Sequence, residues 1–267
     1  MLGPNGAGKT TTLHMLAGLL KPTTGNFSFI GLQGDIRQWI GFLPQYPAFY
    51  GWMNGEEFLT YVGKLARMKG KKLSDRVEQL LNQVGLSDAK HKRISGYSGG
   101  MKQRLGIAQA LIHQPRLLLL DEPVSALDPI GRREVLGLLQ QIKQETTLLF
   151  STHVLHDAEQ MCEDILIMRK GELVISGSLE QVKQQHQQPV ITVKATQSLA
   201  DWAENIRKEV FVTQLKVMGS TVTVEVNDLA AAKPRLLRSL LDHNVDLLAF
   251  EVAQTSLEDL FMKVVQQ

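Results

Sequence analysis

Residues 3–10 read Gly3-Pro4-Asn5-Gly6-Ala7-Gly8-Lys9-Thr10, which fits the pattern G-x-x-x-x-G-K-S/T of a phosphate-binding loop. The glycines let the backbone turn tightly and approach a ligand closely, because they carry no Cβ atom. The successive backbone N–H groups then point inward and form a binding site for an anion. The sequence therefore predicts that these residues hold the phosphates of a nucleotide.

A helix is predicted directly after this loop, and the positive end of its dipole would face the phosphates. We expect Lys9 to reach the β- and γ-phosphates and the Thr10 hydroxyl to hold Mg²⁺. Thr11, in the first turn, is counted with the nucleotide-binding residues. The alternative is a glycine-rich turn before an ordinary helix. The apolar positions at helical spacing are Leu13, Leu16, Ala17 and Leu20.

Two carboxylates follow the most apolar short run of the chain. Residues 117–120 are four leucines between Pro115 and Pro123, which predicts a fully buried parallel strand. Carboxylates after such a strand lie where α/β sheets bind ligands. Asp121 fits the acid that accompanies Mg²⁺ at a phosphate loop, and Glu122 is a candidate base for an attacking water. The alternative is a pair of solvated turn acids.

Three further positions are candidates for contact with a ligand. Ser98, followed by Gly99 and Gly100, is a good N-cap for a helix to about residue 113, and a phosphate could bind at that helix start. Asp128 is predicted to cap a helix to about residue 144. His153 follows a predicted strand over residues 146–150, which favours a ligand contact over a structural role.

An aromatic cluster follows Gln45, at the end of a strand predicted over residues 40–43. The cluster is either a buried corner or a surface for docking a partner, and the residues alone leave both open. Its members are Tyr46, Phe49, Tyr50 and Trp52, with Met53 beside them.

Five basic residues connect two predicted amphipathic helices, over residues 55–68 and 73–84. A solvated face is the favoured explanation, and contact with anionic headgroups is the weaker one. The basic residues are Lys64, Arg67, Lys69, Lys71 and Lys72.

Composition limits the classes of function. The 267 residues suffice for one large domain or two smaller ones. The net charge of +2 does not suggest a nucleic-acid binder. Cys162 is the only cysteine, so no intrachain disulfide can form and a reducing compartment fits. No run approaches 18 apolar residues, so we expect no membrane span, and we see no secretory signal.

We expect two domains joined by a linker. The first covers residues 1–180, is of the α/β class and also contains a strand over residues 26–30. A glutamine-rich, apolar-poor linker is predicted over residues 181–189. Residues 190–267 then show the order strand-helix-strand-strand-helix-strand of a ferredoxin-like α+β domain. No chemical cluster occurs there, so this domain is interpreted as a binding or assembly module.

These elements together resemble the nucleotide-binding subunit of ABC transporters, a family with a P-loop NTPase fold. The resemblance covers residues 1–180, with the family's helical subdomain at about residues 54–113. The discriminating element is Ser98-Gly99-Gly100-Met101-Lys102-Gln103, although Tyr97 stands where the family usually has Leu. The tail around residues 255–261 resembles the C-terminal extension of ABC-2-type exporter ATPases, the drug-resistance branch.

The resemblance implies a head-to-tail dimer with two bound ATP molecules and Mg²⁺. One subunit would supply the phosphate loop, and the other would supply Ser98 and Gly100, with Gly99 and Gln103 in the same element. Asp128 would couple the two sites. Glu122 would polarise the water, His153 would contact the γ-phosphate, and Gln45 would sense Mg²⁺ and the water. The remaining residues of each site are Lys9, Thr10 and Asp121.

The resemblance also implies partners and a location. The segment Tyr46–Met53 follows Gln45, where the family docks a coupling helix of a separate polytopic permease, here of the ABC-2 type. The expected place is the cytoplasmic face of the cell membrane, as a peripheral subunit, without nucleic acid. The second nucleotide-binding subunit is the same chain or a different one. The sequence identifies neither the transported substrate nor, beyond the tail resemblance, the direction of transport.

The family carries a few dozen residues before the phosphate loop, including strands and an aromatic residue that stacks on adenine. Here only Met1 and Leu2 precede Gly3, and Leu2 could be the last residue of the expected buried strand. We therefore expect a mis-called start or an incomplete gene, which the intact mass of the native protein would test. Two other functions remain open: a non-transport ATPase of the same fold that acts on ribosomes or DNA, and an inactive truncated remnant.

Overall fold

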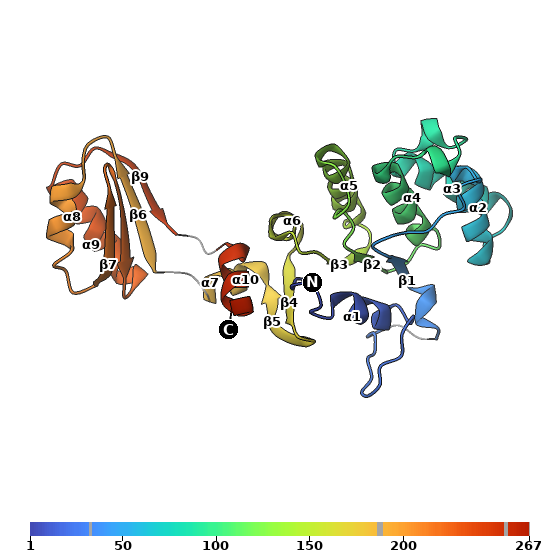
Figure 1. Ribbon diagram of the computed structural model, residues 1–267, viewed down its shortest axis with the longest axis horizontal. Coiled ribbons are helices and arrows are strands. Elements are labelled where there is room, and N and C mark those ends of the chain that lie inside the picture. Colours follow the sequence, from blue (N-terminus) through green and yellow to red (C-terminus); the bar gives the residue numbers. More distant parts are fainter. Residues whose placement is uncertain (32–33, 186–188, 254–255, 267) are drawn as a thin grey trace. The chain divides into compact units, whose positions relative to one another are not determined.

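The computed structural model describes residues 1–31, 34–185, 189–253 and 256–266 (Figure 1). Contacts divide the chain into two units, residues 1–179 with 264–267, and residues 180–263. Each unit is described by itself. Among the described residues, no helix combines the length and the apolar composition needed to cross a membrane.

The first unit is built on a parallel sheet of three strands in the order β1-β2-β3. The central strand is the leucine run, and Leu118, Leu119 and Leu120 are fully buried, as predicted. Parallel strands end at the same edge of a sheet, so the residues after each strand come together there. The strands are β1 (Ile40–Leu43), β2 (Leu117–Asp121) and β3 (Thr147–Ser151).

Leu2 enters this framework directly before the phosphate loop. It forms parallel bridges to Thr152, which follows β3, and to Ile167 in β4 (Asp164–Arg169). The Leu2 N–H donates to the Leu166 carbonyl at 2.7 Å, and the Thr152 N–H donates to the Met1 carbonyl at 3.1 Å. The backbone at Leu2 is therefore held like the end of a strand, as predicted. Strand β4 also pairs antiparallel with β5 (Glu172–Ser178).

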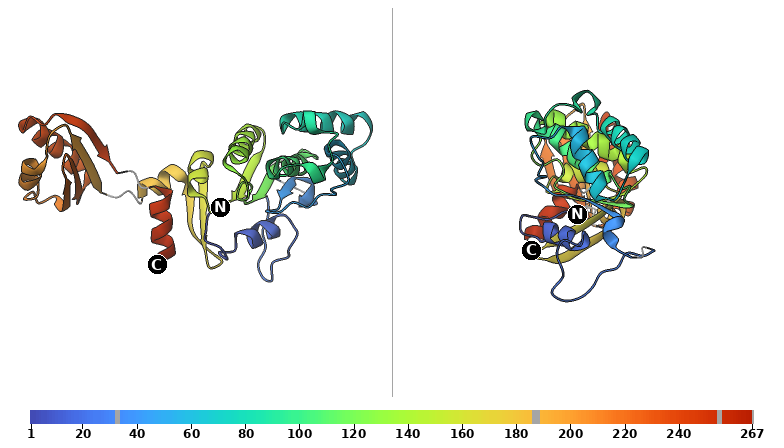
Figure 2. Two further views of the ribbon diagram at one scale, coloured as in Figure 1. Left: turned by 45° about the horizontal axis from the view of Figure 1, so that its top comes forward. Right: turned by 90° about the vertical axis from the view of Figure 1, so that its right-hand side faces the viewer.

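Helices cover both faces of the sheet: α1 lies on one face, and α4 and α5 lie on the other (Figures 1 and 2). An Asn54–Glu57 capping box starts α2, and Ser98 caps α4 as predicted. The helices of this unit are α1 (Lys9–Leu16), α2 (Gly55–Leu65), α3 (Gly70–Gln83), α4 (Gly99–Leu111), α5 (Pro129–Ile142) and α6 (Leu155–Met161). Three short 3₁₀ helices cover Ile36–Gln38, Ser87–Ala89 and Ile94–Gly96.

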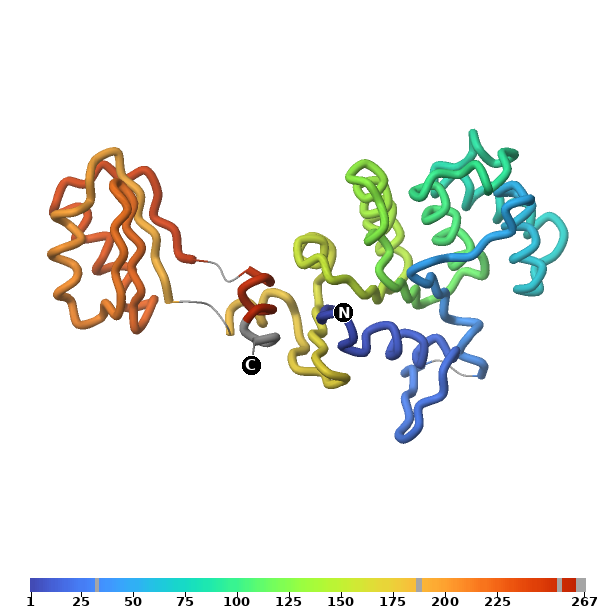
Figure 3. The backbone as a smooth tube through the Cα atoms, viewed as in Figure 1, coloured from blue at the N-terminus to red at the C-terminus, as the bar shows by residue number. Residues whose placement is uncertain are grey.

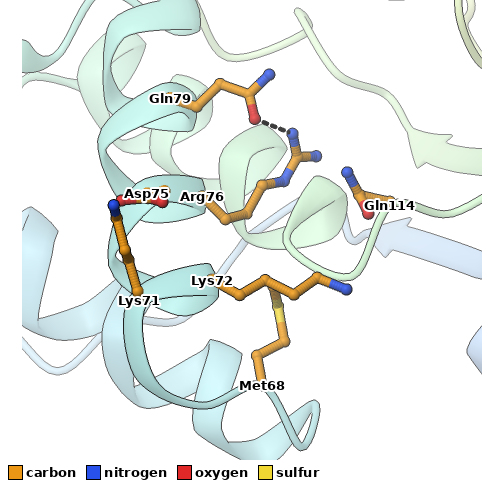
Figure 4. Close-up of a pocket in the computed structure, with 7 residues that line it drawn as sticks. All are labelled: Met68, Lys71, Lys72, Asp75, Arg76, Gln79 and Gln114. Carbon is orange, nitrogen blue, oxygen red and sulfur yellow. Dashed lines mark hydrogen bonds between the residues drawn. The ribbon is translucent and has the colours of Figure 1, made fainter.

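Arg76 connects α3 to the end of α4, and Figure 4 shows its side chain beside Gln79. Its guanidinium donates to the Leu111 carbonyl at 2.7 Å and to the Ile112 carbonyl at 3.4 Å, and it also bonds to Gln79. These carbonyls have no partner within α4, so the arginine, together with the Gln114 N–H on the Leu111 carbonyl, satisfies the helix end. The five basic residues singled out above are all exposed, which agrees with a solvated face.

One predicted strand is wrong, and two other elements show detail that was not predicted. Residues 26–30 form no strand but part of a long loop after α1 (Figure 3), because no neighbouring strand lies beside them among the described residues and Ile30 is completely exposed. Asp128 takes the N-cap position of α5, as predicted, although its side chain makes no capping bond. The predicted linker begins as a helix, α7 (Leu179–Gln185), since glutamine and lysine are good helix formers and Val182 is buried. Residues 186–188 of that linker lie outside the described residues.

The second unit has the predicted strand and helix order. Its antiparallel sheet has the order β7-β8-β6-β9, which is the ferredoxin-like arrangement. One core joins its strands to both helices, with Trp202 and Leu236 buried between them. The elements are β6 (Val190–Ala195), α8 (Ala200–Ile206), β7 (Val212–Met218), β8 (Thr221–Val226), α9 (Leu229–Asp242) and β9 (Leu247–Val252), and α10 (Leu257–Gln266) follows.

Candidate active site

The phosphate loop depends on glycine backbone conformations. The φ angles of Gly3, Gly6 and Gly8 are 159°, 78° and 100°. A Cβ atom on Gly3 would lie 2.5 Å from the carbonyl oxygen of Met168, so this glycine allows the hairpin strand to approach. The first hydrogen bond of α1 runs from the Thr12 N–H to the Gly8 carbonyl. The N–H groups at the helix start are therefore left for an anion.

Lys9 is held inside the loop. Its Nζ donates to the carbonyls of Gly3 at 2.8 Å and Pro4 at 3.2 Å, and the residue is 6% exposed. An ammonium group has three donors, so one remains for a ligand. The same Nζ lies 4.0 Å from Glu122 Oε1. The loop therefore presents one oriented positive charge next to the candidate base.

Glu122 joins the loop to the histidine that follows β3. Glu122 Oε2 lies 2.8 Å from His153 Nδ1, and the glutamate is 7% exposed. The His153 side chain is 53% exposed, so its ring reaches from the carboxylate toward solvent. The structure thus brings Lys9, Glu122 and His153 together from three elements, where a carboxylate can accept a proton from a bound water.

Asp121 fits the role of a magnesium ligand by its surroundings. It is 2% exposed, and one of its oxygens, Oδ1, accepts a hydrogen bond from the Ser151 hydroxyl, so the other oxygen is left for a metal. Thr10 is exposed at the start of α1, and Gln45 follows β1, whose Leu43 is in register with Leu120. Hydroxyl, amide and carboxylate oxygens are ligands that Mg²⁺ prefers, usually with one or two carboxylates plus substrate phosphates. The described residues contain no group of three or more His, Cys, Asp or Glu side chains that could hold a metal ion by themselves.

The other loop residues differ in exposure. Asn5 and Gly6 are exposed, Pro4 is partly buried and Ala7 is buried. Thr11 is exposed on the first turn of α1.

The helix start capped by Ser98 is exposed. The Ser98 hydroxyl accepts the Met101 N–H at 3.2 Å, and Ser98 and Gly99 are exposed, whereas Gly100 and Gln103 are buried. Asp128 is also exposed. Among the residues that the structure describes, no hydrogen bond or ion pair connects this group to the phosphate loop.

Sequence reasoning missed Ser151, which touches both acids, and the pair Arg132–Asp157. Ser151 could have been found from the strand register, because it lies opposite Asp121. Arg132 in α5 bonds to Asp157 in α6 at 2.6 Å, with Asp157 almost fully buried. No sequence motif identified this pair.

The aromatic cluster is divided between core and surface. Phe49 packs edge-on against Phe58 with ring centroids 5.1 Å apart, as expected for a buried corner. Tyr46 and Trp52 are 75% and 68% exposed, as expected for a docking surface. Tyr50 lies between Trp52 and Tyr61, and its hydrogen bond to Tyr61 raises the pKa of that phenol.

Comparison with known proteins identifies both units. Residues 1–125 match the family described as "ABC transporter", and residues 177–265 match the one described as "ATP-binding protein DrrA1-3-like, C-terminal domain". The uncharacterized ABC transporter ATP-binding protein YxlF of Bacillus subtilis (strain 168) is 48% identical over 99% of this chain and 89% of its own length. A second protein of that strain, YdbJ, is 34% identical over 98% of this chain and 84% of its own length.

Solved structures give the same fold. One, described as the ATP-binding subunit of an ABC transporter, has a TM-score of 0.60 at 29% identity and covers 69% of this chain and 80% of its own. Another, cbiO1 from Clostridium perfringens, described as part of the ABC transporter complex cbiONQ, has a TM-score of 0.62 at 28% identity. It covers 69% of this chain and 78% of its own. The predicted resemblance and fold class are confirmed.

Proposed function

Since the chain belongs to the family of ABC transporter ATP-binding proteins, we propose that it hydrolyses ATP and thereby drives export through a separate membrane permease. The observation that supports hydrolysis most directly is the position of the Glu122 carboxylate. Its Oε2 contacts His153 Nδ1, and its Oε1 lies 4.0 Å from Lys9 Nζ. A nearly buried carboxylate between two nitrogen donors is poised beside the place where a γ-phosphate would bind.

Each residue of the first subunit then has a defined task. The glycine loop binds the phosphates through its N–H groups, and Lys9 donates to the β- and γ-phosphates. Thr10, Gln45 and Asp121 would hold the Mg²⁺ ion, whose charge offsets the negative charge that develops on the phosphates. Glu122 accepts a proton from the attacking water. His153 keeps Nδ1 on Glu122, so Nε2 is available to a γ-phosphate oxygen.

A second nucleotide-binding subunit completes the site. Ser98 and Gly99 are exposed at the start of α4 and unconnected to their own loop, which suits contact with a nucleotide held by another subunit. Asp128, exposed before α5, would couple the two sites across that interface. Gly100 and Gln103 are buried and would support this helix start from behind.

The exposed aromatic side chains are the proposed docking surface for a polytopic permease of the ABC-2 type. Tyr46, Tyr50 and Trp52 are exposed in one segment directly after Gln45, and aromatic residues are enriched at protein interfaces. Docking there would keep the subunit peripheral, at the cytoplasmic face of the membrane. Export is proposed as the direction because the tail resembles that of ABC-2-type exporter ATPases, in the region that matches the DrrA1-3-like C-terminal domain. Co-purification of a polytopic membrane protein, rather than ribosomes, is the expected outcome that separates transport from a non-transport ATPase.

The variant Glu122→Gln tests the chemistry. It keeps the size of the side chain but cannot accept the proton, so we expect ATP hydrolysis to fall by roughly 10²–10⁴-fold, the usual contribution of a general base. Binding of ATP, measured by equilibrium dialysis, should remain. The matched control is Glu145→Gln, an exposed glutamate outside the site, which should leave the rate unchanged. An unchanged rate in Glu122→Gln would remove Glu122 from the base role.

A further inference from the structure

Ser151 is the last residue of β3 and lies in register with Asp121 of β2. It is fully buried. Its hydroxyl donates to Asp121 Oδ1 at 2.6 Å and accepts the backbone N–H of Glu122 at 3.0 Å. The Ser151 carbonyl accepts the same N–H at 3.2 Å. One side chain thus holds two consecutive acids, one by its carboxylate and the other by its backbone.

The backbone at Glu122 requires such support. Its φ angle is +49°, a left-handed conformation that is uncommon for residues other than glycine. Strained conformations persist when surrounding bonds determine them, and they concentrate at functional sites. Here the φ angle aims the Glu122 side chain at His153 and Lys9, while the preceding residue, Asp121, stays at the end of the strand.

The direction of each hydrogen bond is fixed by chemistry. A serine hydroxyl has one proton, and an ionised carboxylate can only accept, so the proton points at Asp121. The lone pairs of Oγ are then left for the Glu122 N–H. Removing the hydroxyl would leave Asp121 Oδ1 without its donor in a buried region, which is costly, and would leave the Glu122 N–H with only the longer bond to the Ser151 carbonyl.

We propose that Ser151 is a positioning residue of the proposed ATPase site: it orients the free oxygen of Asp121 toward Mg²⁺ and the Glu122 carboxylate toward the attacking water. This inference rests on the proposed function. Ser151 acts through Asp121 and Glu122, and this role requires no contact between Ser151 and the nucleotide. A hydroxyl at this place is essential, whereas the identity of the rest of the side chain is secondary.

The test compares Ser151→Ala and Ser151→Thr in the full chain. The first readout is the gain in affinity for a fluorescent ATP analogue when Mg²⁺ replaces EDTA. We expect Ser151→Ala to reduce this gain about 10-fold or more, the size of one hydrogen bond to a charged group, with the affinity in EDTA unchanged. Ser151→Thr keeps the hydroxyl and should restore the gain to within about threefold, because 0.6 kcal/mol corresponds to that factor.

The second readout needs no nucleotide. Amide hydrogen exchange at Glu122 should be faster in Ser151→Ala than in the wild type, and slow again in Ser151→Thr. Ser239→Ala is the matched control, because that hydroxyl accepts the Trp202 indole N–H at 3.1 Å in the other unit. It should change neither readout. Ser151→Cys keeps a side chain of similar volume, but its thiol is a weak hydrogen-bond donor. This variant replaces Ser151→Ala if the latter does not fold. It should also lose the Mg²⁺-dependent gain in affinity.

Two results would overturn the proposal. The first is an unchanged Mg²⁺-dependent gain in both Ser151→Ala and Ser151→Cys. The second is a loss in Ser151→Thr as large as that in Ser151→Ala. If the wild type itself shows no Mg²⁺-dependent binding, the proposed ATPase function fails instead, while protection of the Glu122 amide still reports whether Ser151 holds it.

Discussion

Gly3 shows how a single residue can be required by both the fold and the proposed chemistry. Its φ angle is 159°, and a Cβ atom here would lie 2.5 Å from the Met168 carbonyl oxygen, so the position excludes any side chain. We expect Gly3→Ala to raise the free energy of the native loop conformation by about 2 kcal/mol or more, the size of local backbone strain. That corresponds to roughly 30-fold weaker nucleotide binding if the loop absorbs the strain. Binding of the fluorescent ATP analogue measures it.

The same substitution elsewhere provides the control. Gly137 lies exposed in α5 with nothing within 4 Å of its Cβ position, so Gly137→Ala should raise the thermal midpoint slightly through helix propensity. Equal losses in both variants would show that the environment of Gly3 is not special.

At this scale the sequence identifies residues whose neighbours along the chain form a motif. The loop, the two acids after the leucine run and His153 were all found in this way, and the structure brings Lys9, Glu122 and His153 together. Ser151 was missed because its role depends on a residue 30 positions away, reached only through strand pairing. The pairing register of β2 and β3 must be known before a contact between Ser151 and Asp121 can be inferred.

Among the elements, the end of α4 is fastened to β1 by a histidine. His113 Nε2 lies 3.1 Å from the Ile40 carbonyl. Burial lowers the pKa of His113 below its ordinary value of 6.5, the backbone hydrogen bond raises it, and the nearby Arg76 lowers it further. Because the folded pKa lies below the unfolded one, protonation favours unfolding. The contribution to stability is complete above pH 6.5 and is lost as the pH falls below it.

We therefore expect the thermal midpoint of the wild type to fall more steeply between pH 7 and pH 5.5 than that of His113→Gln, which keeps an N–H donor but does not titrate. Scanning calorimetry at both pH values gives the difference. Parallel curves for the two proteins would contradict the assignment to His113.

Arg76 connects α3 to the end of α4. Burial lowers the pKa of Arg76, and the charge of Glu145 opposes this shift. Arg76→Met keeps much of the aliphatic chain but removes one donor from the Leu111 carbonyl, which keeps the Gln114 N–H, and the arginine donor from the Ile112 carbonyl. We expect a loss of about 1–2 kcal/mol, or roughly 2–8 °C in the thermal midpoint. Lys71→Met, exposed on the same helix, should change the midpoint by less than about 1 °C, since isolated surface charges contribute little.

The elements that sequence periodicity predicted best are those whose burial repeats along the chain, such as β2 and the helices α2 and α3. The strand expected over residues 26–30 failed because alternation alone does not supply a pairing partner. The helical start of the predicted linker was missed because composition was weighed above helix propensity, and Val182 anchors that helix.

For the whole molecule, the sharpest expectation is dimerisation that depends on nucleotide. In the Glu122→Gln background, ATP with Mg²⁺ should double the mass measured by light scattering, because hydrolysis no longer opens the proposed interface. Adding Ser98→Asp should abolish this dimer, since aspartate still caps α4 but places a negative charge opposite the phosphates of the other subunit. Thermal stability should be retained. A dimer that survives Ser98→Asp would place the interface elsewhere.

The presence of two units was predicted from the order of helices and strands along the sequence, and the second unit has the predicted ferredoxin-like sheet. The boundaries at residues 180 and 190 stay predictions. The proposed second subunit could not be inferred from one chain alone, because Ser98 and Gly99 satisfy the local rules of a helix start by themselves. Only the resemblance to a family gave those residues a nucleotide to contact.

The backbone bonds around Leu2 carry a mechanical consequence. Leu2 immediately precedes the loop, Thr152 immediately precedes His153, and the two segments are bonded directly to each other. Because these backbone hydrogen bonds are direct, we expect the phosphate loop and His153 to move together. A displacement of the loop by a bound phosphate would then be passed to His153 through Leu2 and Thr152. A crosslink that restricted the motion of either segment would restrict the motion of both.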